Sequence, residues 1–142
     1  MRIRKALIPA AGLGTRLLPA SKVVPKELLP IVDRPMLHYT VLEALQAGIT
    51  QFIIVTSSGK GSLVDYFHPV EGLESQLLRK GDMAALAKVR ELADTAEFTF
   101  VHQNEQLGLG HAVYTARHAI GDEPFAVLLP DDVIASTEPT IG

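Results

Sequence analysis

Apolar residues recur along this chain with two spacings, one typical of β-strands and one typical of helices. Short apolar runs predict four strands, at residues 5–9, 51–56, 98–102 and 125–129. The first run is apolar on both faces, which is typical of a central strand in a parallel sheet. Helical spacing predicts longer helices at residues 36–47, 73–79, 83–92 and 108–121, and a short helix that ends near Phe67.

Alternating strands and helices imply βαβ units with right-handed crossovers. We therefore expect an α/β fold, Rossmann-like and three-layered around a mostly parallel sheet, in one domain over residues 1–142. Residues 57–96 are long for a single crossover, and we expect them to include a flap. Ligands of such sheets bind beyond the carboxyl ends of the strands. Three stretches follow strand ends and should meet there: the glycine turn after Pro9, residues 103–110, and Asp131-Asp132.

The stretch after the first strand has the composition of a phosphate-binding loop. Gly12 and Gly14 leave backbone N–H groups accessible to an anion, and Thr15 adds a hydroxyl donor. Arg16 supplies a planar fork of donors that suits phosphate oxygens. Lys26 follows between two prolines, which predicts an extended, stiff segment that holds its ammonium group in one place. By pattern alone, these residues fit either a polyphosphate site or an ordinary glycine turn with two solvated cations.

The two later stretches carry candidate groups for a base and a metal ion. The Gln103 amide can pair with the N3–H and a carbonyl of a pyrimidine, and Gly108 lets a flat base lie against the backbone. A polar loop that leads into a helix is the simpler interpretation of that pattern alone. Asp131, at a strand end that faces a triphosphate, would be a natural Mg²⁺ ligand. An Asp pair also suits a solvated turn or a helix cap.

Two other nucleotide-binding signatures, the P-loop and the dinucleotide fingerprint, are incomplete in this chain. Residues 57–62 look like a P-loop, but Ile54 stands where its first glycine belongs, and Gly61 stands where Ser or Thr must follow the lysine. We therefore interpret Lys60 as part of an ordinary loop. The dinucleotide fingerprint fails because Leu17 occupies its third glycine position. The five histidines lack metal-binding spacing, and neither Ser21 nor Ser136 has an evident base beside it.

Composition narrows the class of protein. Hydrophobic residues make up 47% of the chain and charged residues 20%, which predicts a folded domain. The net charge of −3 argues against broad binding to nucleic acid or to a membrane surface. No apolar run approaches the roughly 20 residues that span a membrane. The chain contains no cysteine, which excludes thiol catalysis and is compatible with the cytoplasmic location that we expect.

Two motifs in the first 30 residues resemble a known signature. The runs are Gly12-Leu13-Gly14-Thr15-Arg16-Leu17-Leu18-Pro19 and Pro25-Lys26-Glu27-Leu28-Leu29-Pro30. Together they resemble the signature of the sugar-phosphate nucleotidylyltransferases and, more narrowly, of the bacterial UTP–glucose-1-phosphate uridylyltransferases. The resemblance implies the nucleotide-diphospho-sugar transferase fold. It also implies the reaction of UTP with glucose 1-phosphate to give UDP-glucose and pyrophosphate.

The resemblance also implies roles for individual residues. Arg16 and Lys26 would be the catalytic cations, Arg16 at the β- and γ-phosphates and Lys26 near the α-phosphate and the attacking phosphate. Asp131 would hold the cofactor, Mg²⁺. The remaining residues would bind the nucleotide: Ala10, Ala11, Gly12, Gly14, Thr15, Gln103 and Gly108.

The resemblance covers only the N-terminal half of the family's length. We therefore expect a truncated domain that lacks the sugar-binding residues and a second metal-binding carboxylate and is inactive alone. An uncovered sheet edge would favour self-association, so we expect a homo-oligomer. Two other functions fit the same residues: a thymidylyltransferase acting on glucose 1-phosphate, and a non-catalytic nucleotide-binding module. Residues 108–112 and the long segment 68–96 resemble the UTP enzyme more closely.

Overall fold

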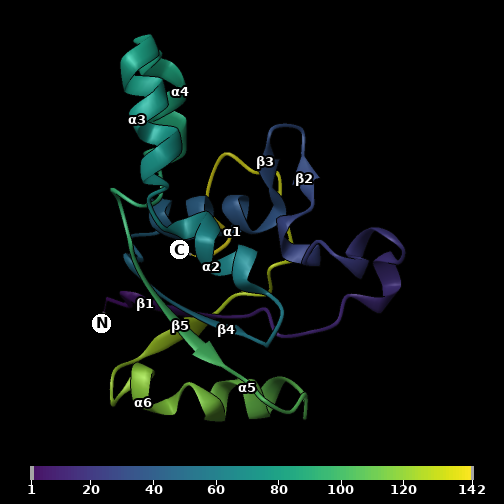
Figure 1. Ribbon diagram of the computed structural model, residues 1–142. Helices are drawn as coiled ribbons and strands as arrows, with labels where there is room; N and C mark the ends of the chain where they lie inside the picture. Colours follow the sequence, from purple (N-terminus) through teal and green to yellow (C-terminus); the bar gives the residue numbers. More distant parts are fainter. Residues whose placement is uncertain (1, 142) are drawn as a thin grey trace.

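A parallel four-stranded sheet lies at the centre of the computed structural model, which describes residues 2–141 (Figure 1). The strand order is β5-β4-β1-β6, and every neighbouring pair is parallel. The strands are β1 (Lys5–Pro9), β4 (Gln51–Thr56), β5 (Glu97–His102) and β6 (Phe125–Val127). The predicted parallel α/β sheet is confirmed, with β1 inside it. The last strand ends at Val127, two residues earlier than predicted.

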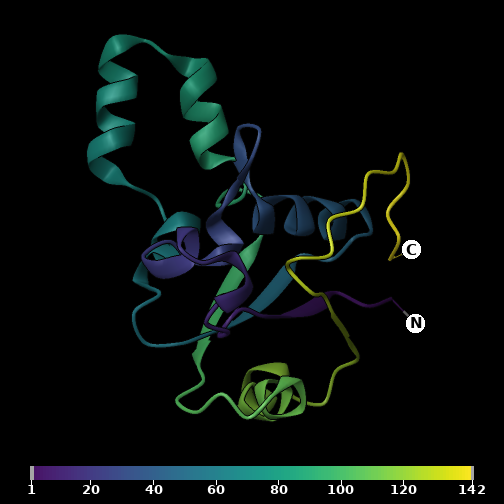
Figure 2. The same ribbon diagram turned by 90° about the vertical axis from the view of Figure 1, so that its right-hand side faces the viewer.

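Helices cover both faces of the sheet, and β1 shows why (Figures 1 and 2). Its side chains alternate between two apolar clusters: Ala6 and Ile8 pack with α1 and α2, whereas Leu7 packs with α5 and α6. A strand that is apolar on both faces therefore needs a helical layer on each side. These helices are α1 (Met36–Gln46), α2 (Gly61–Phe67), α5 (Leu109–Thr115) and α6 (Arg117–Ile120).

Two antiparallel helices, α3 (Glu71–Lys80) and α4 (Met83–Arg90), project from the body as a hairpin (Figure 2). α3 ends at Gly81, which adopts the left-handed conformation with a φ of 70°. The Asp82 carboxylate then caps α4 by accepting the Ala85 N–H at 3.0 Å. This hairpin is the part of the 57–96 connection that stands away from the sheet. No helix in residues 2–141 has the length and apolar character needed to cross a membrane.

The segment between β1 and α1 differs from the sequence prediction. It forms three 3₁₀ helices, η1 (Thr15–Leu17), η2 (Ala20–Lys22) and η3 (Lys26–Leu28), and then a hairpin of β2 (Pro30–Ile31) and β3 (Arg34–Pro35). The prediction that proline keeps the Lys26 segment extended was wrong. Pro25 and Leu29, which flank the turn, are extended, with φ/ψ of −50°/134° and −63°/131°, but Lys26–Leu28 between them form a 3₁₀ turn.

Candidate active site

A cavity of about 330 Å³ lies at the carboxyl edge of the sheet. Its walls come from the segments at the ends of β1, β5 and β6, from the N-terminal part of α5, and from Lys26 of η3. These distant segments meet because parallel strands end at the same edge. β1 has β4 on one side and β6 on the other, so the order of strands reverses there, which is where such sheets bind ligands. The lining residues are Pro9, Ala11, Gly12, Lys26, Gln103, Gln106, Gly108, Leu109, Ala112, Leu129, Pro130 and Asp131.

Two glycines give the turn after β1 its shape. At Gly12, in the cavity wall, no atom lies within 4 Å of where a Cβ would stand, so the backbone is open to a ligand. Gly14 has a φ of 65°, and a Cβ at that position would lie 3.2 Å from the Cβ of Lys26 and 3.1 Å from that of Ser21. Glycine at position 14 therefore allows both the left-handed turn and the close approach of Lys26.

Some predicted site residues lie outside this cavity. Ala10 is fully buried; its N–H donates to the Val55 carbonyl at 2.7 Å, and its own carbonyl accepts from Lys60 Nζ at 2.6 Å. Thr15 lines an adjoining cavity of about 430 Å³ that also contains Lys26. Arg16 is exposed on η1 and lines neither cavity, although its positive charge helps to lower the pKa of Asp131. The structure therefore brings Ala11, Gly12, Lys26, Gln103, Gly108 and Asp131 together, with Arg16 close by.

Lys26 and Asp131 form an ion pair at this cavity, with 3.1 Å between Nζ and Oδ2. Their side chains are 24% and 51% exposed. The hydrogen bond from Lys26 is the main cause that lowers the pKa of Asp131, so the carboxylate is ionised at neutral pH. Exposed ion pairs contribute only about 0–1 kcal/mol, because water and salt screen them. A phosphate or a cation could therefore separate this pair at little cost.

Gln103 and Gly108 lie in the same cavity. Gln103 is buried, and its Nε2 lies 2.8 Å from His111 Nδ1. Because His111 takes the amide nitrogen, the carbonyl oxygen of Gln103 is left as the acceptor for a ligand. Gly108 has a φ of 96°, a conformation that favours glycine, and α5 begins directly after it. This arrangement offers an acceptor and a bare backbone surface next to each other.

Sequence reasoning missed three contacts at this site. Gln106 Nε2 donates to the Ala11 carbonyl at 2.8 Å and so braces the glycine turn. Lys60 binds Glu27 in a buried ion pair. His111 orients the Gln103 amide. The sequence offers one sign that Glu27 is buried: this charged residue stands directly before the apolar pair Leu28-Leu29. Its partner lies 33 residues away, so the pattern of one sequence does not reveal the pair.

Asp131 offers a single carboxylate to a metal. In residues 2–141, no group of three or more His, Asp or Glu side chains is arranged to hold a metal ion. Mg²⁺ commonly binds one or two carboxylates and completes its shell with phosphate oxygens and water. One ionised carboxylate beside a phosphate-binding turn fits that chemistry, provided that a nucleotide supplies the other oxygens.

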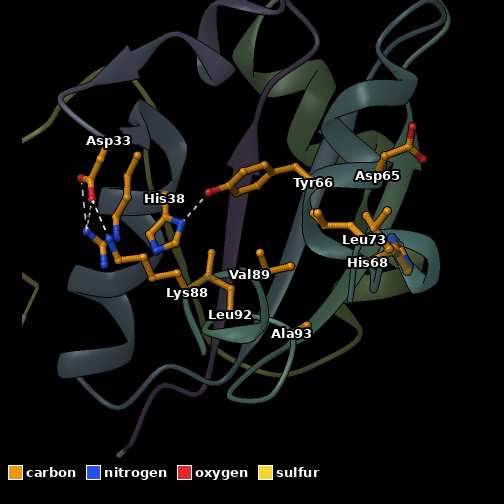
Figure 3. A pocket seen from close by; sticks show the side chains of 12 residues that line it. Asp33, His38, Asp65, Tyr66, His68, Leu73, Lys88, Val89, Leu92 and Ala93 are labelled. Carbon is orange, nitrogen blue, oxygen red and sulfur yellow. Dashed lines mark hydrogen bonds and ion pairs between the residues drawn. The ribbon is translucent and has the colours of Figure 1, made fainter. Parts of the chain in front are cut away.

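A third cavity, of about 310 Å³, lies between the body and the α3–α4 hairpin (Figure 3). His38 is buried beside it, with Nδ1 2.7 Å from Tyr66 Oη and Nε2 3.0 Å from Glu91 Oε2. Arg34 also donates to Glu91 at 3.3 Å. His38, Tyr66, Arg34 and Glu91 are therefore linked to one another, and apolar side chains such as Leu73 complete the lining. This arrangement is that of a structural network.

Comparison with known proteins identifies the family. Residues 5–140 match the nucleotidyl transferase family. This chain belongs to the nucleotidyl transferase family. It is 53% identical over 140 residues to UTP–glucose-1-phosphate uridylyltransferase 2 of Staphylococcus saprophyticus, a match that covers 99% of this chain and 48% of that protein. The predicted resemblance is confirmed.

Solved structures agree with this assignment. A UTP-bound UGPase from Acinetobacter baumannii is 48% identical with a TM-score of 0.87, covering 91% of this chain and 46% of that one. A structure assigned as a glucose-1-phosphate thymidylyltransferase of Bacillus anthracis is more distant, at 26% identity and a TM-score of 0.71, covering 93% of this chain and 46% of that one. The predicted fold is confirmed, and the chain spans about half the length of the curated relatives it matches.

Proposed function

We propose that this chain carries the nucleotide-binding part of a UTP–glucose-1-phosphate uridylyltransferase, which converts UTP and glucose 1-phosphate into UDP-glucose and pyrophosphate. The observation that carries the proposal is the convergence of the Gly12 turn, Lys26, Gln103 and Asp131 on one cavity. The S. saprophyticus relative named for this activity and the UTP-bound A. baumannii structure support the choice of substrate.

In this proposal the cavity has a base end and a phosphate end. The carbonyl oxygen of Gln103 would accept the N3–H of uracil, and Gly108 would let the ring lie against the backbone. The backbone N–H groups of the turn at Gly12 and Gly14 would bind the phosphates. Purines lack this combination of an N3–H and flanking carbonyls, so the site should prefer a pyrimidine.

The reaction forms one bond and breaks one at the α-phosphorus. A phosphate oxygen of glucose 1-phosphate attacks the α-phosphorus of UTP, and the bond from that phosphorus to the bridging oxygen of the β-phosphate breaks, which releases pyrophosphate. Lys26 would leave Asp131 for the reacting phosphates, and Arg16 would hold the β- and γ-phosphates. Catalysis would come from alignment and charge neutralisation; losing one such contact typically costs ~10²–10³ in rate.

Mg²⁺ belongs to this proposal as the cofactor. When bound, it would neutralise phosphate charge in the ground state and in the transition state. Asp131, which Lys26 would release, would hold it together with phosphate oxygens.

An NMR titration of this chain with Mg²⁺ and UTP, dTTP, ATP or GTP in turn tests the nucleotide site. We expect UTP to shift the signals of Gly14, Lys26, Gln103 and Gly108, and purines to shift them little. A response to none of the four nucleotides would overturn the proposal. A stronger response to dTTP would favour a thymidylyltransferase instead.

The reaction is tested by pyrophosphate release from UTP and glucose 1-phosphate in the complete gene product. We expect turnover there and none from these 142 residues alone. Nucleotide binding without turnover in the complete product would favour a non-catalytic nucleotide-binding module.

A cytoplasmic location and a homo-oligomeric assembly are further parts of the proposal. Within residues 2–141, β5 and β6 are the edge strands of the sheet, and unpaired edge groups favour association between chains. Light scattering coupled to size exclusion tests the assembly, and cell fractionation tests the location.

A further inference from the structure

Lys60 connects three segments around the candidate site. It lies in the loop between β4 and α2, and its Nζ donates to the Ala10 carbonyl at 2.6 Å. The same group donates to both carboxylate oxygens of Glu27, at 3.1 and 3.3 Å. Ala10 stands just before the glycine turn, and Glu27 follows Lys26 directly in η3. One ammonium group therefore ties the start of the turn to the short helix that carries Lys26.

These contacts leave Lys60 no donor for a ligand. A lysine ammonium has three N–H groups, and here three acceptors surround it. Its side chain is only 11% exposed. Lys60 does not line the cavity that holds Gln103 and Asp131, and in the adjoining cavity, which it lines with Thr15 and Lys26, its three donors are already taken. A P-loop lysine, by contrast, reaches the phosphates themselves. Any effect of Lys60 on a nucleotide must pass through the residues that it holds.

The burial of Glu27 makes this arrangement hard to change. Its side chain is 1% exposed, and Lys60 is its one side-chain partner in the described part of the chain. A carboxylate away from water is stable only when it is paired and hydrogen-bonded. Glu27 must therefore stay within reach of Lys60, and the backbone of the adjacent Lys26 stays with it.

We propose that Lys60 is a positioning residue for nucleotidylyl transfer. By holding Glu27 and the Ala10 carbonyl together, it sets the separation between the Gly12 turn and Lys26, so that the phosphates of UTP can meet both. This inference rests on the proposed function and adds to it a residue that touches neither substrate.

Three variants separate positioning from simple stabilisation. Lys60→Met keeps the length of the side chain and removes its charge. The double variant Glu27→Met/Lys60→Met leaves no buried charge behind, and such apolar replacements commonly preserve stability. Lys80→Met changes a lysine that is exposed on α3, and it is the matched control. For each protein, NMR titration gives the dissociation constants of uridine and of UTP with Mg²⁺, and urea unfolding gives the stability.

We expect Lys60→Met to raise the dissociation constant of UTP about tenfold or more, because small misplacements of binding groups have effects of that size. Uridine binding should change less than about twofold, because the Gln103 end of the cavity keeps its own contacts. The double variant should regain the urea unfolding midpoint of the unmodified protein but not its affinity for UTP. Lys80→Met should change neither. If Lys60→Met does not fold, the comparison of the double variant with the unmodified protein tests the inference.

Two results would overturn the inference: recovery of UTP affinity together with stability in the double variant, or equal weakening of uridine and UTP. Both presuppose that the unmodified chain binds UTP more tightly than uridine. If it does not, the proposed function itself fails, and the inference fails with it.

Discussion

Two lysine–carboxylate pairs at the candidate site share a distance and differ in burial. Lys26–Asp131 and Lys60–Glu27 each have 3.1 Å between nitrogen and oxygen, and Lys26 and Glu27 are neighbours in η3. Water reaches the first pair, so a ligand can separate it cheaply. The second pair is buried, and breaking it would leave a charge without a partner. Burial, and not distance, distinguishes the lysine that can meet a phosphate from the lysine that holds the scaffold.

Glu27→Ala should have the largest effect on stability. The substitution leaves the Lys60 ammonium buried without its carboxylate, for which the usual cost is about 3–5 kcal/mol. Because the Ala10 carbonyl still accepts from Lys60, we expect the low end, about 3 kcal/mol, in urea unfolding. Glu27→Gln, which keeps an acceptor, should cost clearly less. A loss below about 1 kcal/mol for Glu27→Ala would show that the buried pair is as dispensable as an exposed one.

Lys26→Ala should have the opposite profile. We expect the free energy of unfolding to change by less than about 1 kcal/mol, because the pair with Asp131 is exposed. Affinity for UTP should fall modestly, up to about tenfold, and turnover in the complete gene product should fall ~10²–10³ or more. Isothermal titration and pyrophosphate release measure the two effects. Equal losses in binding and turnover would contradict the role at the reacting phosphates.

The sheet could be predicted from the sequence because its signals are local. β1 and β4 have the predicted bounds, since both are short apolar runs bounded by turn residues. The cap at Asp82 was predictable for the same reason. The helix predicted over 108–121 instead divides at Ala116 into α5 and α6. Spacing of apolar residues does not reveal such a break.

The site was predictable in outline and not in its supports. Parallel topology alone indicated that Gly12, Gln103 and Asp131 would meet, and they line one cavity. The sequence does not predict the 3₁₀ geometry at Lys26, because proline fixes its own φ and restricts only the residue before it, which leaves the residues between Pro25 and Leu29 free to turn. The Lys60–Glu27 pair was missed because it depends on burial and on a contact across 33 residues. Both are properties of the folded chain and leave no local pattern.

A third polar contact, at His38, is buried like the Lys60–Glu27 pair. The neutral imidazole fits its surroundings, since Tyr66 Oη can donate to Nδ1 (Figure 3) while Nε2–H donates to Glu91. Burial lowers the pKa of His38 below its usual value of about 6.5, against the opposing effect of Glu91. Below that pH the unfolded chain binds a proton that the folded chain does not. Stability should therefore fall as the pH decreases below about 6.5, with a slope that one proton limits to about 1.4 kcal/mol per pH unit.

Urea unfolding between about pH 5 and pH 7.5 checks this expectation. His38→Gln should flatten the profile in that range, and His118→Gln, at an exposed position, should leave it unchanged. A profile that rises as the pH falls would mean that Glu91 stabilises the imidazolium more than burial opposes it.

The smallest expected effect is the coupling between Lys26 and Asp131 themselves. A double-mutant cycle with Lys26→Met and Asp131→Asn should give about 0.2–1 kcal/mol, the range of exposed pairs. The coupling should shrink further in about 1 M salt, where the screening length is about 3 Å. The same cycle on Lys60 and Glu27 should give a larger coupling that salt hardly changes, because salt does not reach a buried pair. Similar coupling energies with similar salt dependence would mean that a ligand can separate either pair equally easily. Lys60 would then become a second candidate for direct contact with the phosphates.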